Sequence, residues 1–125
     1  CQVSRSMRAL GLRDVMARRR DKKESNMMIP YSFKLGDKNW SVHRVFAVEG
    51  KNKVGKVFYD LHAIQIATHR KQQPRSDEAK AETFWHEVTH AVLHDMGDAK
   101  HGDERWVTAF STRLNQVVHT ARLPL

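Results

Sequence analysis

The chain has 125 residues, with 22 Lys and Arg against 14 Asp and Glu, and a formal net charge of +8. Hydrophobic residues make up 40% of it and charged residues 29%, a mixture typical of one small globular domain. No apolar run approaches the roughly 20 residues that a membrane-spanning helix needs, so we expect no membrane partner. Cys1 is the single cysteine, which excludes an internal disulfide and fits a reducing compartment such as the cytoplasm.

The positive charge is concentrated in the N-terminal quarter of the chain. Residues 1–26 hold eight Lys and Arg and three Asp and Glu, so they carry +5 and residues 27–125 carry +3. A basic arm can bind nucleic acid, but this one has no aromatic side chain to stack on bases. We therefore expect a flexible arm, or a short helix near 7–20, ahead of a domain over 27–125.

Short apolar runs at the start of this domain predict strands. The turn residues Gly36 and Asp37 divide one region into strands near 29–35 and 39–48, which predicts a hairpin. The segment "VFYDLHAIQIAT" that follows is rich in branched and aromatic residues, as strands are, and Asp60 is a candidate turn that divides it in two.

The apolar period then becomes helical. Ser76 or Asp77 can cap a helix over about 77–95 that stops at Gly97. Its buried stripe is expected to consist of Phe84, Val88, Ala91 and Val92.

A second helix is expected from about Asp103, with Pro124 beyond its end. Its apolar side comprises Trp106, Val107, Phe110, Leu114, Val117 and Val118. Strands followed by helices predict an α+β domain with a small antiparallel or mixed sheet.

The first of these helices contains His86-Glu87-Val88-Thr89-His90, an HExxH sequence. Residues four apart on a helix differ by about 40° in direction and by one turn in height, so His86 and His90 can face one ion. Glu87 can reach a water on that ion without being a ligand. Zinc in a catalytic site takes three protein ligands and leaves one position for water, whose proton the glutamate removes.

The third ligand remains open between several residues near the start of the second helix. Glu104 begins that helix, and antiparallel packing would carry its carboxylate back toward the ion. His101 is the main alternative, and Asp103 is more naturally the helix cap. His94 lies on the same helix as the first two ligands, where three ligands rarely close a tetrahedral face. Leu93 stands where the longer HExxHxxGxxH pattern requires glycine, which excludes the metzincin pattern.

The stretches "HEVTHAVLH" and "DERWVTAFSTRL" resemble the small zincin-like metallopeptidases of phages and bacteria that are related to the ImmA/IrrE group. The resemblance covers about residues 28–120, with Glu104 and Phe110 at the positions of that family's E-x-x-x-x-x-F context. It implies a minimal, gluzincin-like peptidase domain with Zn²⁺ held by His86, His90 and Glu104 and with Glu87 as the base. It also implies a peptide or protein substrate and, for a phage protein, a place in the host cytoplasm.

Other residues receive roles that depend on this hypothesis. The segment 61–67 is a candidate edge strand for binding substrate backbone, with an internal core strand as the equal alternative. Donors for the developing oxyanion are sought among His101, Arg105 and Tyr59. The remaining histidines are expected to be surface residues: His43, His62, His69 and His119. The three tryptophans are expected in the core: Trp40, Trp85 and Trp106.

Three functions compete at this point. A zinc metallopeptidase is favoured because a purely structural zinc site has no need of Glu87. The alternatives are a non-catalytic binding protein on a zincin scaffold and a nucleic-acid-binding module that uses residues 1–26. Oligomeric state and cleavage specificity do not follow from the residues.

Overall fold

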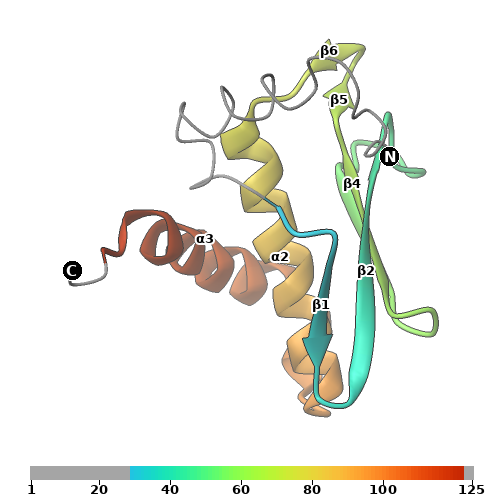
Figure 1. Cartoon of the computed structure of the whole chain (residues 1–125). Coiled ribbons are helices and arrows are strands. Elements are labelled where there is room, and N and C mark those ends of the chain that lie inside the picture. Colours follow the sequence, from blue (N-terminus) through green and yellow to red (C-terminus); the bar gives the residue numbers. More distant parts are fainter. Residues whose placement is uncertain (1–28, 123–125) are drawn as a thin grey trace, which may run out of the picture.

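The computed structural model describes residues 29–122, in which strands precede helices (Figure 1). The strands are β1 (Ser32–Leu35), β2 (Lys38–Val45), β3 (Gly55–Phe58), β4 (Ala63–Ala67), β5 (His69–Arg70) and β6 (Gln73–Pro74). The helices are α2 (Asp77–Asp95), the short 3-10 helix η2 (Ala99–Gly102) and α3 (Glu104–Thr120). The predicted basic arm over 1–26, with its helix near 7–20, and Pro124 lie outside the described residues.

Four strands form one mixed sheet in the order β1-β2-β4-β3, and β5 and β6 form a separate small hairpin. β1 pairs antiparallel with β2, β2 pairs parallel with β4, and β4 pairs antiparallel with β3. The α+β class, with a small mixed sheet ahead of the helices, is confirmed.

The first hairpin confirms the turn read from Gly36 and Asp37. Gly36 has φ +64°, a left-handed conformation that glycine adopts without steric cost. The turn pairs Leu35 with Lys38 and brings Phe33 opposite Trp40, whose rings stack with centroids 5.9 Å apart. Such aromatic cross-strand pairs stabilise a register.

Asp60 lies in the turn that separates β3 from β4, also as predicted, with His62 at φ +52°. The proposal of 61–67 as an exposed edge is wrong, because β4 lies between β2 and β3. β4 has a neighbouring strand along each edge, β2 and β3, and nearly all of its residues are buried: Ala63, Ile64, Ile66 and Ala67. The free edge on this side of the sheet belongs to β3.

Helix α2 has the bounds that its sequence predicts. The Ser76 hydroxyl accepts a hydrogen bond from the Ala79 N–H at 3.0 Å, which caps the first turn. Asp77 and Glu78 follow in that turn, where negative charge complements the helix dipole. The helix ends before Gly97, which adopts φ +73°.

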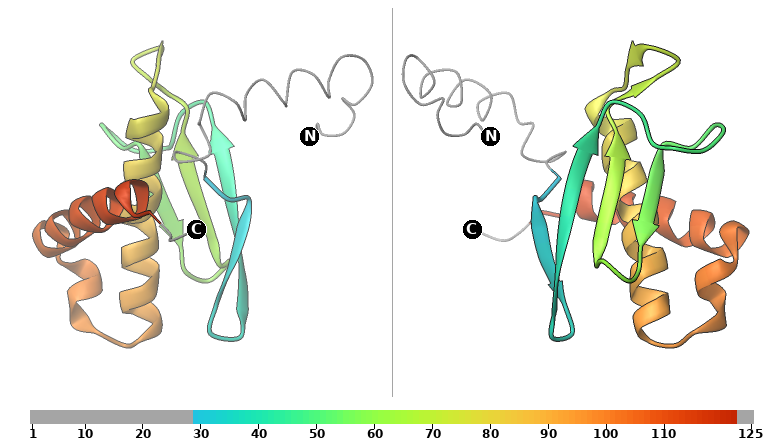
Figure 2. Two further views of the ribbon diagram at one scale, coloured as in Figure 1. Left: turned by 60° about the vertical axis from the view of Figure 1, so that its left-hand side comes forward. Right: turned by 90° about the vertical axis from the view of Figure 1, so that its right-hand side faces the viewer.

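The core lies between the sheet and α2. Ile64 and Ile66 of β4 are 0% exposed and pack in one cluster with Phe84 and Ala91 of α2. Val88 is partly buried against this cluster. Figure 2 shows the resulting layers, with the sheet on one side of α2 and α3 on the other.

Helix α3 is less buried than predicted. Val107 and Ser111 are its buried residues, at 0% and 1% exposure. The rest of the expected apolar side is only partly covered, and four residues are exposed: Trp106, Phe110, Val117 and Val118. The reason is that, among the described elements, α3 packs mainly on α2, with fewer contacts to η2.

The tryptophans differ accordingly. Trp40 is buried and Trp85 packs partly buried against the core, as predicted. The prediction for Trp106 is wrong, because this side chain is 36% exposed and stacks on Phe110 along α3. Within residues 29–122, no helix combines the length and the apolar character that crossing a membrane requires.

Candidate metal centre

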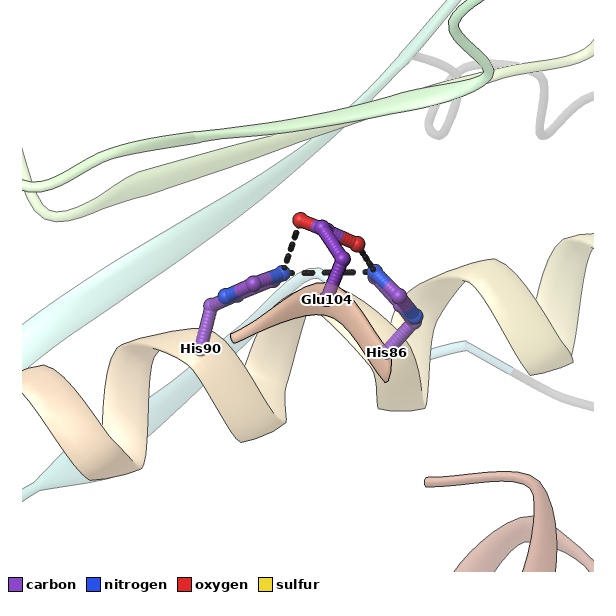
Figure 3. A group of neighbouring side chains, drawn as sticks. All are labelled: His86, His90 and Glu104. Atoms are coloured by element: carbon purple, nitrogen blue, oxygen red, sulfur yellow. Dashed lines mark hydrogen bonds and ion pairs between the residues drawn. The ribbon is translucent and has the colours of Figure 1, made fainter. Parts of the chain in front are cut away.

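The two histidines of the HExxH sequence lie one turn apart on the same side of α2 (Figure 3). Their Nε2 atoms are 3.2 Å apart, and the rings meet edge to face. His90 is buried, whereas the side chain of His86 is 22% exposed. The helical spacing therefore brings both imidazoles to one point, as the sequence predicts.

Glu104 brings the third group from the first residue of α3. Its Oε1 lies 3.0 Å from Nε2 of His86, and its Oε2 lies 2.9 Å from Nε2 of His90. Helix α3 starts at this position because the Asp103 carboxylate accepts a hydrogen bond from the Trp106 N–H and caps it. The short helix η2 turns the chain back, so the start of α3 lies beside the middle of α2 (Figure 3).

The donor set fits a tetrahedral metal ion. With bonds of about 2.0–2.1 Å to zinc, the ligand atoms of a tetrahedron lie about 3.3 Å apart. The Nε2 atoms of the two histidines lie 3.2 Å apart, close to that value. The two Glu104 oxygens approach one histidine each, and one ligand atom from each of the three residues lies within 4.8 Å of the others. Within residues 29–122, these are the only three His, Cys, Asp or Glu side chains that lie close enough together to share an ion.

A backbone carbonyl orients the second histidine. Nδ1 of His90 donates a hydrogen bond to the carbonyl oxygen of His101 at 2.6 Å. A proton on Nδ1 leaves the Nε2 lone pair free for a metal. Burial lowers the pKa of His86, although the Glu104 carboxylate acts in the opposite direction, and this favours the neutral imidazole that a metal binds.

The alternative third ligands lie elsewhere. The His94 ring is exposed and stacks on Tyr59, with centroids 4.1 Å apart. The His101 ring meets both of these rings edge to face, so this residue contacts the centre through its carbonyl group. Asp103 caps α3. Among the candidates considered, Glu104 is the residue whose side chain reaches both histidines.

Glu87 is buried beside the three side chains that could hold a metal ion, at 8% exposure. Burial, with a smaller contribution from the Glu104 charge, raises the pKa of Glu87 to about 7, and Lys53 opposes this shift. Glu87 fits below β3 only because residue 55 is glycine. A Cβ atom there would lie 2.7 Å from Glu87 Oε2 and 2.5 Å from Thr83 Cγ2.

The metal-binding groups open into a cleft of about 800 Å³ between β3, α2 and η2. Tyr59 and His101 line this cleft, but Arg105 does not. Burial, followed by the negative charges of Glu87 and Glu104, raises the pKa of Tyr59, so its hydroxyl keeps its proton and remains a donor. Trp85 and Trp106 do not line the cleft and therefore do not shield it.

The edge of β3 has unpaired backbone groups. Ala67 donates to the Val54 carbonyl at 2.9 Å, so Val54 and Lys56 direct their N–H and C=O groups toward β4. The alternation of an antiparallel ladder then turns the groups of Gly55 and Val57 away from β4. Sequence analysis missed this edge, although a glycine inside a strand is a known sign of close approach by another group.

The scattered histidines are not part of the centre. His43 lies beside the Ser41 hydroxyl, His62 beside the Trp40 ring and His69 against Phe46. His119 lies far along α3, in a groove that it shares with Ser76. As predicted, none of the four belongs to the candidate metal centre; of the four, His43 is exposed, and the others are partly buried rather than fully on the surface.

No protein-family model, curated protein or solved structure was found to match this chain.

Proposed function

We propose that the protein is a zinc-dependent metallopeptidase in which His86, His90 and Glu104 hold the ion and Glu87 acts as the general base. The observation that carries the proposal is the convergence of these three side chains, from two helices, beside a fourth side chain, the buried carboxyl group of Glu87. A site that only binds an ion needs the three ligands and has no need of Glu87. The sequence resemblance to zincin-like peptidases supports the same assignment.

When bound, zinc would lower the pKa of a coordinated water to about 7 and polarise the substrate carbonyl. Glu87 would accept the proton of the attacking water and then deliver it to the nitrogen of the leaving amine. General bases work best with a pKa near the working pH, and in the metal-free protein burial raises the pKa of Glu87 to about 7. The Glu87 carboxylate lies close against the backbone of Gly55, where an added Cβ would be 2.7 Å from Oε2.

The peptide substrate would lie along β3 as an additional strand. The outward N–H and C=O groups of Gly55 and Val57 can pair with its backbone, which needs no particular side chain. This assigns to β3 the role that the sequence suggested for 61–67. Tyr59 is our candidate for stabilising the developing oxyanion, because it lines the cleft and keeps its phenolic proton.

A non-catalytic protein on the same scaffold is disfavoured by the burial of Glu87. A carboxyl group whose pKa is raised destabilises the folded protein when it ionises, and a purely structural metal site gains nothing from this. The nucleic-acid-binding module rests on residues 1–26 and stays a prediction.

The test compares metal content with hydrolysis of a mixed-sequence fluorogenic peptide pool. We expect about one zinc per chain in the unmodified protein and in Glu87→Gln, with kcat reduced about 10²- to 10⁴-fold in Glu87→Gln. His86→Ala and Glu104→Ala should lose the metal as well as activity.

Glu49→Gln, an exposed carboxyl group in the loop before β3, is the matched control and should change neither quantity. Hydrolysis that survives in Glu87→Gln would refute the assigned base. Zinc retained in Glu104→Ala would move the third ligand elsewhere.

A further inference from the structure

One end of the sheet is strongly cationic. The loop before β3 and the hairpin β5–β6 both lie at this end, where β2 and β4 finish (Figure 2). Together with the start of β3 and Arg75, the residue after β6, they carry six basic residues, which we call the cationic end: Lys51, Lys53, Lys56, Arg70, Lys71 and Arg75. Glu49 is the single acid of these segments. Within the described residues, none of the six forms an ion pair.

The cationic end is continuous with the cleft of the metal centre. Lys53, Lys56 and Arg75 line the same cleft as His86 and Glu87. Lys53 is exposed and near enough to Glu87 for its charge to lower that pKa. The positive charges therefore lie beside the path of any chain that pairs with β3.

Arg75 has a structural task as well. Its guanidinium donates to the carbonyl oxygens of Ala67 and Ala79 and to the Thr83 hydroxyl, the last at 2.6 Å. This holds the start of α2 against the end of β4 while the charge remains at the cleft. Lys53 has no such partner and is the residue free to meet a ligand.

One further acid lines this part of the cleft. Glu82 of α2 lines the cleft, but its Oε2 accepts a hydrogen bond from the Thr112 hydroxyl of α3 at 3.1 Å. The negative charge of Glu82 still acts on His86, but three basic side chains line the same part of the cleft: Lys53, Lys56 and Arg75. This excess of positive charge attracts negatively charged groups.

We propose that the cleft selects polypeptide substrates that carry acidic side chains on the C-terminal side of the cleaved bond. The inference rests on the proposed peptidase function. The direction follows from strand pairing, because antiparallel pairs are the more stable kind. A substrate antiparallel to β3 runs from Tyr59 toward Lys53, so its C-terminal part meets the cationic end.

A polypeptide fits these features better than a nucleic acid. The unpaired groups of Gly55 and Val57 are spaced for a peptide backbone, and Lys53 and Lys56 lie next to them in sequence and line the same cleft. Phosphates would find the charges but would leave these backbone groups unpaired.

The test uses three fluorogenic peptides that differ only in charge: one neutral, one with two Asp after the cleaved bond and one with two Asp before it. We expect the zinc-loaded protein to cleave the second with kcat/KM about fivefold above the first, and the third no faster than the first. Lys53→Glu should remove this preference. Lys34→Glu, the same charge change on the exposed opposite edge strand, should leave it intact.

Equal rates for the three peptides, or a preference that survives Lys53→Glu, would overturn the inference and leave the peptidase proposal standing. A binding measurement tests the charge selection if the peptidase proposal itself fails. If no peptide is cleaved, fluorescence anisotropy of the second peptide on Glu87→Gln protein still tests the charge selection, through its dependence on Lys53. A single-stranded oligonucleotide that binds this end more tightly than the acidic peptide would also overturn the proposal.

Discussion

The two helices of this protein differ in how they are held. Helix α2 lies between the sheet and α3 and buries eight residues, Glu87 and His90 among them. Helix α3 buries two and exposes much of its apolar side. The candidate metal centre joins these unequal parts, with His86 and His90 from the well-packed helix and Glu104 from the first residue of the loosely packed helix. A bound ion would therefore stabilise the position of α3 more than that of α2.

The largest effect should come from the core between β4 and α2. Ile66 is 0% exposed, and Ile66→Ala should cost about 2–5 kcal/mol of unfolding free energy, through lost burial and the cavity left behind. Chemical denaturation measures this. Ile66→Val removes one methyl group and should cost about 1 kcal/mol. A cost below 1 kcal/mol for Ile66→Ala would contradict the description of the sheet and α2 as the well-packed part of the molecule.

Glu87, which is buried in α2, should make the free energy of unfolding depend on pH. Its pKa is raised from 4.5 to about 7, so the stability tied to its neutral form is present below pH 4.5 and lost as pH rises through 7. In metal-free protein, Glu87→Gln should therefore gain about 3 kcal/mol over the unmodified protein between pH 4 and pH 8. Denaturation at both pH values, with chelator present, measures the difference. Glu49→Gln should show none.

Gly55 tests how closely β3 approaches α2. Gly55→Ala should cost about 2 kcal/mol, because the added Cβ would press on Thr83 and Glu87. It should also reduce peptide hydrolysis by displacing Glu87, with zinc content unchanged. Gly102→Ala is the control, since its Cβ meets nothing within 4 Å. If both variants behaved alike, the close contact would be refuted.

The smallest effect is expected on the exposed side of α3. Val117 is 60% exposed, and Val117→Ala should change the unfolding free energy by less than about 0.5 kcal/mol. Val107 lies on the same helix and is 0% exposed, so Val107→Ala should lower the unfolding free energy by about 2 kcal/mol. Equal costs would mean that the outer side of α3 is covered in solution by something other than residues 29–122.

Much of this arrangement was determined locally by the sequence. Ser76 and Gly97 mark the two ends of α2, Gly36 forms the first turn, and Asp103 caps α3. Each acts through its own backbone and its nearest neighbours, so the signal survives without any knowledge of the fold. The spacing of His86 and His90 belongs to the same category, because one helical turn sets their separation.

The tertiary structure decided what depends on distant parts of the chain. The parallel pairing of β2 with β4 makes β4 internal and leaves β3 as the edge, which no local pattern in 61–67 could reveal. The path of η2 brings the side chain of Glu104, rather than that of His101, to the two histidines. The burial of Glu87 under Gly55 likewise depends on how strand and helix pack. Such contacts join residues far apart in sequence, and only the folded chain selects among them.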